Sequence, residues 1–252
     1  MATKKNNRSK SSAGLKIAAH FGFKPHYLGL CGPKQARQDK LLQKFLQGKV
    51  PAIKMRPVFR KFMGAYSYYK LIARSNKIKD PFDERVVSAY WIGNNLLNKV
   101  KTEDLRRMVA EEFAGPGLLL KQVAIKKATS IPKGSKPHHS FHVLIIGSVT
   151  GSVDFKNTAL KDLCRIGWGA VKKIKNKSCV VECRQFSGEK NIKIGKLIKK
   201  EVIWDKNLVA GLKIGDPVAF HWNCICDKIT PIQKKNLEYW TKYHLKIANQ
   251  TI

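Results

Sequence analysis

The chain has 252 residues, enough for one large domain or two ordinary ones, and 43% of them are hydrophobic, which can fill a core. These values exclude a disordered chain. The longest apolar run, VLIIGSV from Val143, is far too short to cross a bilayer, so we expect no membrane span.

The charge is extreme, with a formal value of +32 and a pI near 10.1. Such a field attracts polyanions such as RNA, DNA or an anionic membrane face. Most of the basic residues are lysines, which fits a general lysine bias as well as it fits a nucleic-acid partner. Charge by itself leaves both interpretations open.

The six cysteines and the lack of a recognisable signal peptide predict a cytoplasmic protein whose thiols stay reduced. No disulfide framework is expected. The opening MATKKNNRSKSS has no apolar stretch and predicts a basic disordered tail over residues 1–13.

Residues 14–158 predict a mainly helical domain. Helical spacing, caps and breakers mark four helices: one over KQARQDKLLQKFLQGK from Lys34, one from about Arg56, one capped by Asp80 with Pro81 at its first position, and one capped by Thr102 and ended by the glycines of GPG at 115–117.

The segment KPHHSFHVLIIGSV breaks this pattern, because a loop-like start is followed by a β-branched run that predicts a strand near 139–149. Its three histidines, His138, His139 and His142, form a candidate metal site. On a strand, His138 and His142 would share a face about 13 Å apart, too far for one ion. Structural histidines, and a site completed by residues from elsewhere in the chain, both stay open.

Residues 159–250 predict a small OB-like β-barrel followed by a C-terminal helix, so the fold class is α+β. Short strand-like segments alternate with turns, and TPIQ gives the closing helix a capping box from Thr230 to Gln233. The expected strands are GAVKKIKN, SCVVECRQF, a lysine-rich stretch ending in EVIW, LKIGD and PVAFHWNCICDKI.

Alternation along two of these strands indicates buried thiols at Cys179, Cys183, Cys224 and Cys226. A zinc site is the alternative. Cysteines two apart on an extended strand hold their sulfurs about 6 to 7 Å apart, whereas tetrahedral zinc needs roughly 3.7 Å, so the spacing favours core cysteines.

Two motifs in this half carry a resemblance. CRIGWGAVKKI, from Cys164 to Ile174, has a cysteine before a glycine-flanked strand, and IGDPVAFHWNCI runs from a turn into a strand with His221. In order and spacing, residues 163–244 resemble the HypC/HupF family of hydrogenase assembly chaperones. The segments LGLCGP, DPFDERVVSAYWIGNNLL and HHSFHV resemble, over the whole chain, a bacterial and archaeal family of unknown function.

The chaperone resemblance implies a non-enzymatic assembly factor that binds a metal-centre intermediate or a client through the barrel mouth. Cys164 would be a thiolate ligand to an iron atom carrying cyanide and carbonyl, with His221 as a second ligand or hydrogen-bond donor. The implied partners are a HypD-like protein and the precursor of a hydrogenase large subunit. The sequence departs from that family in three ways: Cys164 is internal, Trp168 replaces a proline, and the closing helix is rich in lysine.

The alternative function is RNA binding by the OB-like barrel, with Trp168 and Trp204 as exposed stacking residues and Lys172 and Lys173 at the phosphates. An enzyme is not expected, because the sequence has no Walker loop, Rossmann fingerprint, nucleophile elbow or zincin motif. A cysteine-nucleophile arrangement of Cys164, His139 and Asp162 has no sequence feature that would bring its members together.

Overall fold

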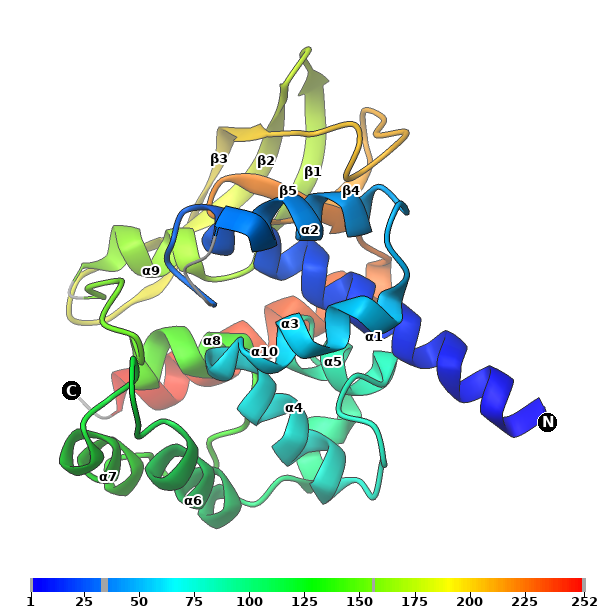
Figure 1. Ribbon diagram of the computed structural model, residues 1–252. Helices are drawn as coiled ribbons and strands as arrows, with labels where there is room; N and C mark the ends of the chain where they lie inside the picture. Colours follow the sequence, from blue (N-terminus) through cyan, green and yellow to red (C-terminus); the bar gives the residue numbers. More distant parts are fainter. Residues whose placement is uncertain (1, 33–35, 156, 251–252) are drawn as a thin grey trace.

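Helices fill the chain as far as Cys164, strands follow, and one long helix closes it, in the computed structural model of the protein (Figure 1). The structure describes residues 2–32, 36–155 and 157–250. This arrangement confirms a mixed α+β fold with helices first and a sheet second. The helical elements are α1 (Ala2–Tyr27), α2 (Ala36–Leu46), η1 (Ala52–Met55), α3 (Arg56–Arg60), α4 (Met63–Ser75), α5 (Glu84–Trp91), η2 (Asn95–Lys99), α6 (Thr102–Glu112), α7 (Lys121–Thr129), α8 (His139–Phe141), η3 (His142–Ile146), α9 (Thr158–Cys164) and α10 (Pro231–Asn249).

Five strands form a sheet that closes in a ring in the order β1-β2-β3-β5-β4, with a parallel contact between Ile203 and Cys224 joining β3 to β5. The inner face is apolar and includes Cys179 and Cys183, as the alternation predicted. The strands are β1 (Gly167–Ile174), β2 (Ser178–Ser187), β3 (Lys193–Ile203), β4 (Pro217–His221) and β5 (Cys224–Lys228).

The segment expected as one strand, PVAFHWNCICDKI, is a hairpin. Trp222 and Asn223 make its two-residue turn, with φ of 50° and 55°. This left-handed geometry matches the twist of the paired strands. Trp222 therefore leaves the face that it was expected to share with Val218 and Phe220. Cys224 and Cys226 are buried, and Cys226 packs with the helical core.

LKIGD, expected as a strand, belongs to the connection between β3 and β4. In it, Asp216 accepts a hydrogen bond from the backbone of Lys213 at 2.8 Å. Gly215 and Asp216 each form one backbone hydrogen bond with Val171 of β1, so the segment meets the sheet as a turn and not as a strand.

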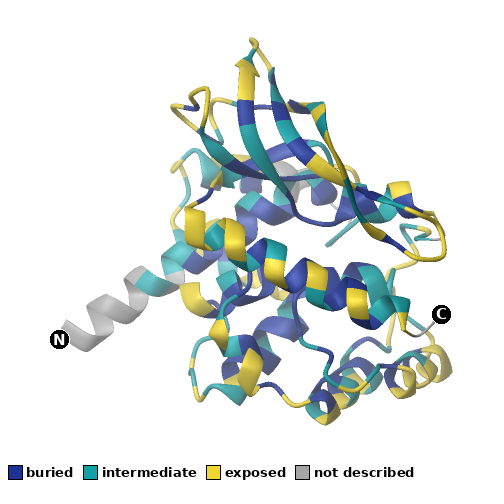
Figure 2. Cartoon of the chain, turned by 180° about the vertical axis from the view of Figure 1, so that it is seen from behind, coloured by how far each residue is buried: buried dark blue, intermediate teal, exposed yellow. Residues whose placement is uncertain are grey.

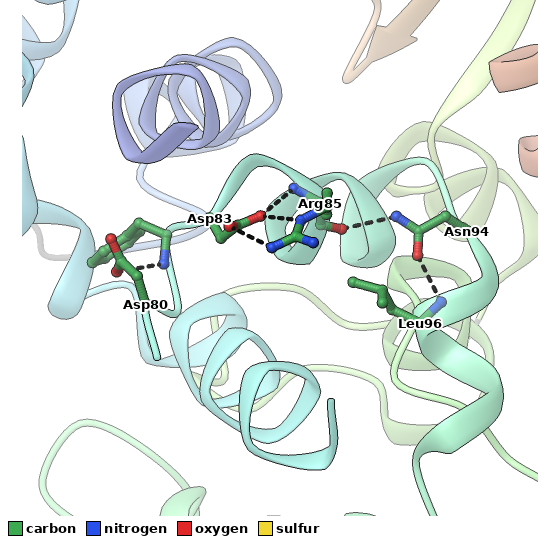
Figure 3. Close-up of polar contacts among 6 residues, drawn as sticks. Asp80, Asp83, Arg85, Asn94 and Leu96 are labelled. Carbon is green, nitrogen blue, oxygen red and sulfur yellow. Dashed lines mark hydrogen bonds and ion pairs between the residues drawn. The ribbon is translucent and has the colours of Figure 1, made fainter. Parts of the chain in front are cut away.

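The third helix begins later than expected, at Glu84, because Asp83 is its cap (Figure 3). Asp83 accepts a hydrogen bond from the backbone of Arg85 at 3.0 Å and pairs with the Arg85 guanidinium. Asp80 instead accepts from the backbone of Phe82 and forms an ion pair with Arg56 at 2.7 Å. Aspartate favours the cap position at both places in the sequence, and in the structure Asp83 caps the helix while Asp80 pairs with Arg56.

The helix predicted from Arg56 is interrupted at Lys61 and Phe62, between α3 and α4. Thr102 is the first residue of α6 rather than its cap, and its hydroxyl accepts a hydrogen bond from the backbone of Gly134 at 3.0 Å. The Thr102 hydroxyl is thus used by a long-range contact instead of the helix end.

The closing helix α10 begins as predicted, with both hydrogen bonds of the capping box between Thr230 and Gln233. Exposed positions run along the side of the helix that Figure 2 shows, whereas Leu237, Trp240 and Leu245 are buried. Helix α10 therefore packs one face on the rest of the protein and leaves the other in solvent.

The prediction of a strand near 139–149 is wrong. Residues 139–146 are helical: α8 is followed directly by η3, which is a π-helical segment. The His138 side chain accepts a hydrogen bond from the backbone of Ser140 and caps this turn. Phe141, Val143 and Ile146 are buried, so burial of an apolar face overrode the β preference of the run.

Residues 2–13, expected as a disordered tail, belong to α1, and Met1 lies outside the described residues. Farther along, the same helix buries Leu15, Ala18 and Phe21. Among the described residues, no helix combines the length and the apolar character that a membrane span requires.

Candidate metal centre

Three ligand-type side chains from distant parts of the chain converge in the interior. They are His139 of α8, Cys164 at the end of α9 and His221 at the end of β4. One ligand atom from each lies within 4.8 Å of those of the other two. The residues are 4%, 8% and 2% exposed, so the cluster is enclosed by the helices and the sheet.

His221 has one ring nitrogen anchored and one unused. Its Nδ1 donates to the backbone oxygen of Phe21 at 2.8 Å, and its buried Nε2 has no hydrogen-bond partner. Burial lowers the pKa of His221 to about 4, so the ring is neutral near pH 7 and Nε2 carries a lone pair. A ligating histidine usually has this arrangement, with the second nitrogen held by a carbonyl.

Each ring nitrogen of His139 has a hydrogen-bond partner. Its Nε2 donates to the backbone oxygen of Cys164 at 2.8 Å, and its Nδ1 lies 3.1 Å from the hydroxyl of Tyr90. Burial, and then the adjacent His221 and His142, lower the pKa of His139 well below the ordinary value. The Tyr90 hydroxyl also reaches the backbone oxygen of Gly64 at 3.2 Å, so it has a second acceptor when a metal takes Nδ1.

Cys164 ends α9, and β1 begins three residues later at Gly167; the sequence had placed this cysteine at the mouth of the strand. Burial raises the pKa of its thiol, Cys31 raises it further, and Trp222 lowers it. The indole nitrogen of Trp222 is buried, and its effect on the thiol is that of a hydrogen-bond donor. It is a donor that could stabilise the thiolate formed when a metal displaces the thiol proton.

The three atoms fit one transition-metal ion after a small adjustment. Nitrogen and sulfur ligands of tetrahedral zinc lie about 3.3 to 3.6 Å apart, which is about 1.2 to 1.5 Å less than the 4.8 Å limit of this cluster. Two imidazoles and a thiolate are ligands for zinc, copper and iron. A set of three leaves a coordination position for water or another ligand.

The cluster lies on the wall of a cavity of about 450 Å³. Apolar and aromatic side chains, including Trp91, Val149 and Phe155, make up much of the lining. His142 also lines it, and its Nδ1 lies 3.2 Å from the Tyr68 hydroxyl. A cavity of this size beside an incomplete ligand set can hold a small molecule or admit a metal ion.

The predicted histidine cluster therefore separates into different environments. His139 joins the centre, and His142 faces the same cavity. His138 belongs to another network, in which its Nδ1 lies 2.7 Å from the Ser140 hydroxyl and that hydroxyl lies 2.8 Å from Nδ1 of His244. Because the segment is helical, neighbouring side chains diverge, and His138 has a structural role.

The residues proposed for RNA binding do not form one exposed surface. Trp204 is 6% exposed and donates its indole hydrogen to Val209, which corrects the expectation of an exposed stacking residue. Trp168 is half-buried beneath the guanidinium of Arg165. Lys172 and Lys173 are exposed, and Lys172 pairs with Glu182 at 3.1 Å.

The structure brings together only two of the three residues of the cysteine-nucleophile arrangement. His139 and Cys164 come together, but Asp162 accepts a hydrogen bond from Arg165 at 2.8 Å and another from the backbone of Phe186. These contacts give the carboxylate a structural partner in the buried Arg165.

The sequence did not identify Tyr90 or Trp222 as site residues, and it paired His139 with Cys164 only in the cysteine-nucleophile arrangement, not as metal ligands. Tyr90 lies in an expected helix without a motif that marks it, and Trp222 lies within the segment expected as one strand. The dipeptide WN is not a usual two-residue hairpin signal, and only Asn223 favours the left-handed conformation that both residues adopt. No local pattern joins residues 139 and 164, because helix and sheet packing brings them together.

The geometry defines a mixed α+β protein with an enclosed candidate metal centre. The model of a family of unknown function (DUF6390) matches residues 10–252, and the chain belongs to that family. This confirms the expected membership of an uncharacterised family over the whole chain; the HypC/HupF resemblance stays a prediction. No curated protein and no solved structure matches the chain.

Proposed function

We propose that this protein binds a transition-metal ion through His139, Cys164 and His221. The observation that carries the proposal is the convergence of three buried ligand-type side chains, one of which, His221, has a ring nitrogen without a geometric hydrogen-bond partner. An isolated acceptor in the interior costs about 1 to 3 kcal/mol, and a metal ion would remove that cost.

The ligand set suits an ion of borderline or soft character. Thiolate is a strong donor to zinc, copper and low-spin iron, and imidazole binds all three. Since both histidines are neutral and the thiol is protonated near pH 7, binding releases the Cys164 proton and requires none from the imidazoles.

A non-enzymatic assembly role, as the chaperone resemblance implies, is part of this proposal. Its two expected ligands, Cys164 and His221, lie together, and His139 is added to them. The cargo would be an iron atom carrying cyanide and carbonyl, and the partner a HypD-like protein or a hydrogenase precursor. The OB-like character of the closed sheet is likewise proposed. Since Cys164 is 8% exposed, a partner would receive the ion through the cavity and not at an open barrel mouth.

Metal analysis tests the binding step. We would purify the protein without chelators and measure bound metals by mass spectrometry, then titrate the metal-free protein with Co²⁺. The expected result is one ion per chain and a thiolate-to-cobalt charge-transfer band. Cys164→Ala should abolish the band and His221→Ala should weaken binding at least tenfold. Cys179→Ala, inside the sheet, is the matched control and should change neither.

The assembly role has its own measurement. Protein isolated from hydrogenase-expressing cells should show infrared bands of bound cyanide and carbonyl that disappear with Cys164→Ala. If metal binds but these bands and client maturation are indifferent to Cys164, the assembly role is wrong and metal binding stands.

RNA binding is the second candidate, supported by the exposed Lys172 and Lys173 and the charge of +32. Affinity for a single-stranded RNA should then fall steeply between 50 and 200 mM salt, on the order of tenfold or more. Replacing both lysines with Gln should reduce that salt dependence. Affinity indifferent to salt would remove this candidate.

A further inference from the structure

A second group of soft ligand atoms lies on the wall of the same cavity. Cys31, Met63 and His142 all line it, and none of them belongs to the buried cluster of three. Thiolate and thioether sulfur favour soft ions such as Cu(I), and imidazole is compatible with them. The cavity thus contains two sets of side chains that can bind metal.

The residues on either side of Met63 lie close to Gly32, next to Cys31, and to His142. Gly32, next to Cys31, lies against the Phe62 ring so closely that an added Cβ would be 2.6 Å from it. On the other side of Met63, a Cβ on Gly64 would lie 3.9 Å from Cε1 of His142. Cys31 and His142 therefore flank the segment that carries the Met63 thioether.

The Cys31 segment is also fixed in place. Nδ1 of His26 lies 3.0 Å from the backbone oxygen of Cys31, and the His26 ring lies 5.0 Å from that of Phe62. A held backbone keeps the thiol at the cavity wall.

The two ligand sets differ in how far they are buried. The residues of the second set are half-buried, and those of the candidate centre are buried. Exposed residues of the same cavity lining include Lys61, Pro116, Gly117 and Thr150. The second set is therefore the more accessible of the two to an ion that enters the cavity from solvent.

We propose that Cys31, Met63 and His142 form a loading site that accepts a soft metal ion and passes it to His139, Cys164 and His221. This inference rests on the proposed metal binding. The Cys31 thiol releases its proton to solvent as the sulfur–metal bond forms. On transfer, Cys164 releases its proton, Cys31 regains one, and the oxidation state of the metal stays the same.

The rate of metal uptake tests the transfer. Metal-free protein would be mixed anaerobically with Cu(I) held in a coloured bicinchoninate complex, and uptake followed by loss of the colour. Wild-type protein should take up one Cu(I) at the centre. Cys31→Ala should slow uptake at least tenfold while the final amount bound stays the same. Met63→Leu, which keeps the volume but removes the sulfur, should also slow Cu(I) uptake. It should leave Zn²⁺ uptake unchanged, because zinc in proteins takes thiolate, imidazole or carboxylate ligands.

Matched controls replace the same residue types away from the cavity. Cys179→Ala in the sheet and Met108→Leu in the helical core should load within twofold of wild type. Circular dichroism of each variant checks the fold. If Cys31→Ala and Met63→Leu both load Cu(I) at the wild-type rate, the loading site is wrong. If wild-type protein takes up no metal, or does so independently of Cys164, the proposed function itself fails.

Discussion

Lowering the pH from 7.5 to 5 should destabilise this protein strongly, because its interior holds histidines that bind protons only after unfolding. Burial lowers the pKa of His142 and His221 to about 4 and that of His244 to about 3. In the unfolded chain each returns to about 6.5. Since the folded pKa is depressed, the stability is present above pH 6.5 and is lost as the pH falls toward the folded values.

The magnitude follows from these values. At pH 5 an unfolded histidine carries nearly a full proton, whereas a folded one with a pKa near 4 carries about a tenth of one. The difference lowers the free energy of unfolding by about 2 kcal/mol for each residue, or about 6 kcal/mol for the three. A typical domain has about 5 to 15 kcal/mol in total. Asp227, whose pKa burial raises while the nearby His20 lowers it, opposes part of this loss.

Urea unfolding at pH 7.5, 6.5, 5.5 and 5.0, followed by tryptophan fluorescence, measures the effect. The free energy of unfolding should decrease steadily below pH 6.5 at a constant urea dependence. His244→Gln should reduce the loss between pH 7.5 and 5 by about 2 kcal/mol, since one proton is removed from the difference. Equal stability at pH 7.5 and 5.0 would show that these histidines are protonated in the folded protein and would refute the reasoning.

Three further outcomes follow from particular contacts. Metal uptake should release about one proton per ion between pH 6 and 8, because Cys164 is the only one of the three ligands that carries a displaceable proton at these pH values. Calorimetry in buffers of different ionisation enthalpy measures this number. Release of two or more protons would contradict neutral histidines. Gly93→Ala should lower the free energy of unfolding in urea by about 3 kcal/mol, since φ is 93° and an added Cβ would lie 2.0 Å from the Trp240 side chain. Gly48→Ala, where φ is 75° and no atom lies within 4 Å of the added Cβ, should lower it less. Arg165→Met should lower the free energy of unfolding by about 3 to 5 kcal/mol, because it leaves the Asp162 carboxylate poorly paired. A decrease under 1 kcal/mol would show that Lys200, whose Nζ lies 3.6 Å from Oδ2 of Asp162, replaces the arginine.

The sequence predicted the elements whose signals are local. The capping box from Thr230 to Gln233 depends on residues three apart, and the structure has both of its hydrogen bonds. The alternation of Cys179, Val181 and Cys183 follows from the pleat of a strand, and all three side chains are buried inside the sheet. Helices before strands, and hence the mixed fold class, also followed from periodicity.

Local signals failed where burial from distant contacts competed with them. The β-branched run after His142 became helical because its apolar face packs inside the protein. The same change of conformation separated His138 from the other histidines and directed His139 toward Cys164. A strand would have sent alternate side chains to opposite faces, so the wrong secondary structure also gave the wrong grouping of ligands.

The sequence by itself determined which residues can bind metal, since cysteine and histidine side chains carry that chemistry in any fold. It named Cys164, His221 and His139, although in two separate sets. Only the tertiary structure decided that they form one cluster, because the His139 ring donates to the backbone oxygen of Cys164 and lies 5.0 Å from the His221 ring. It also decided that Cys164 faces an enclosed cavity, since exposure depends on the side chains that surround a residue and not on its neighbours in the chain.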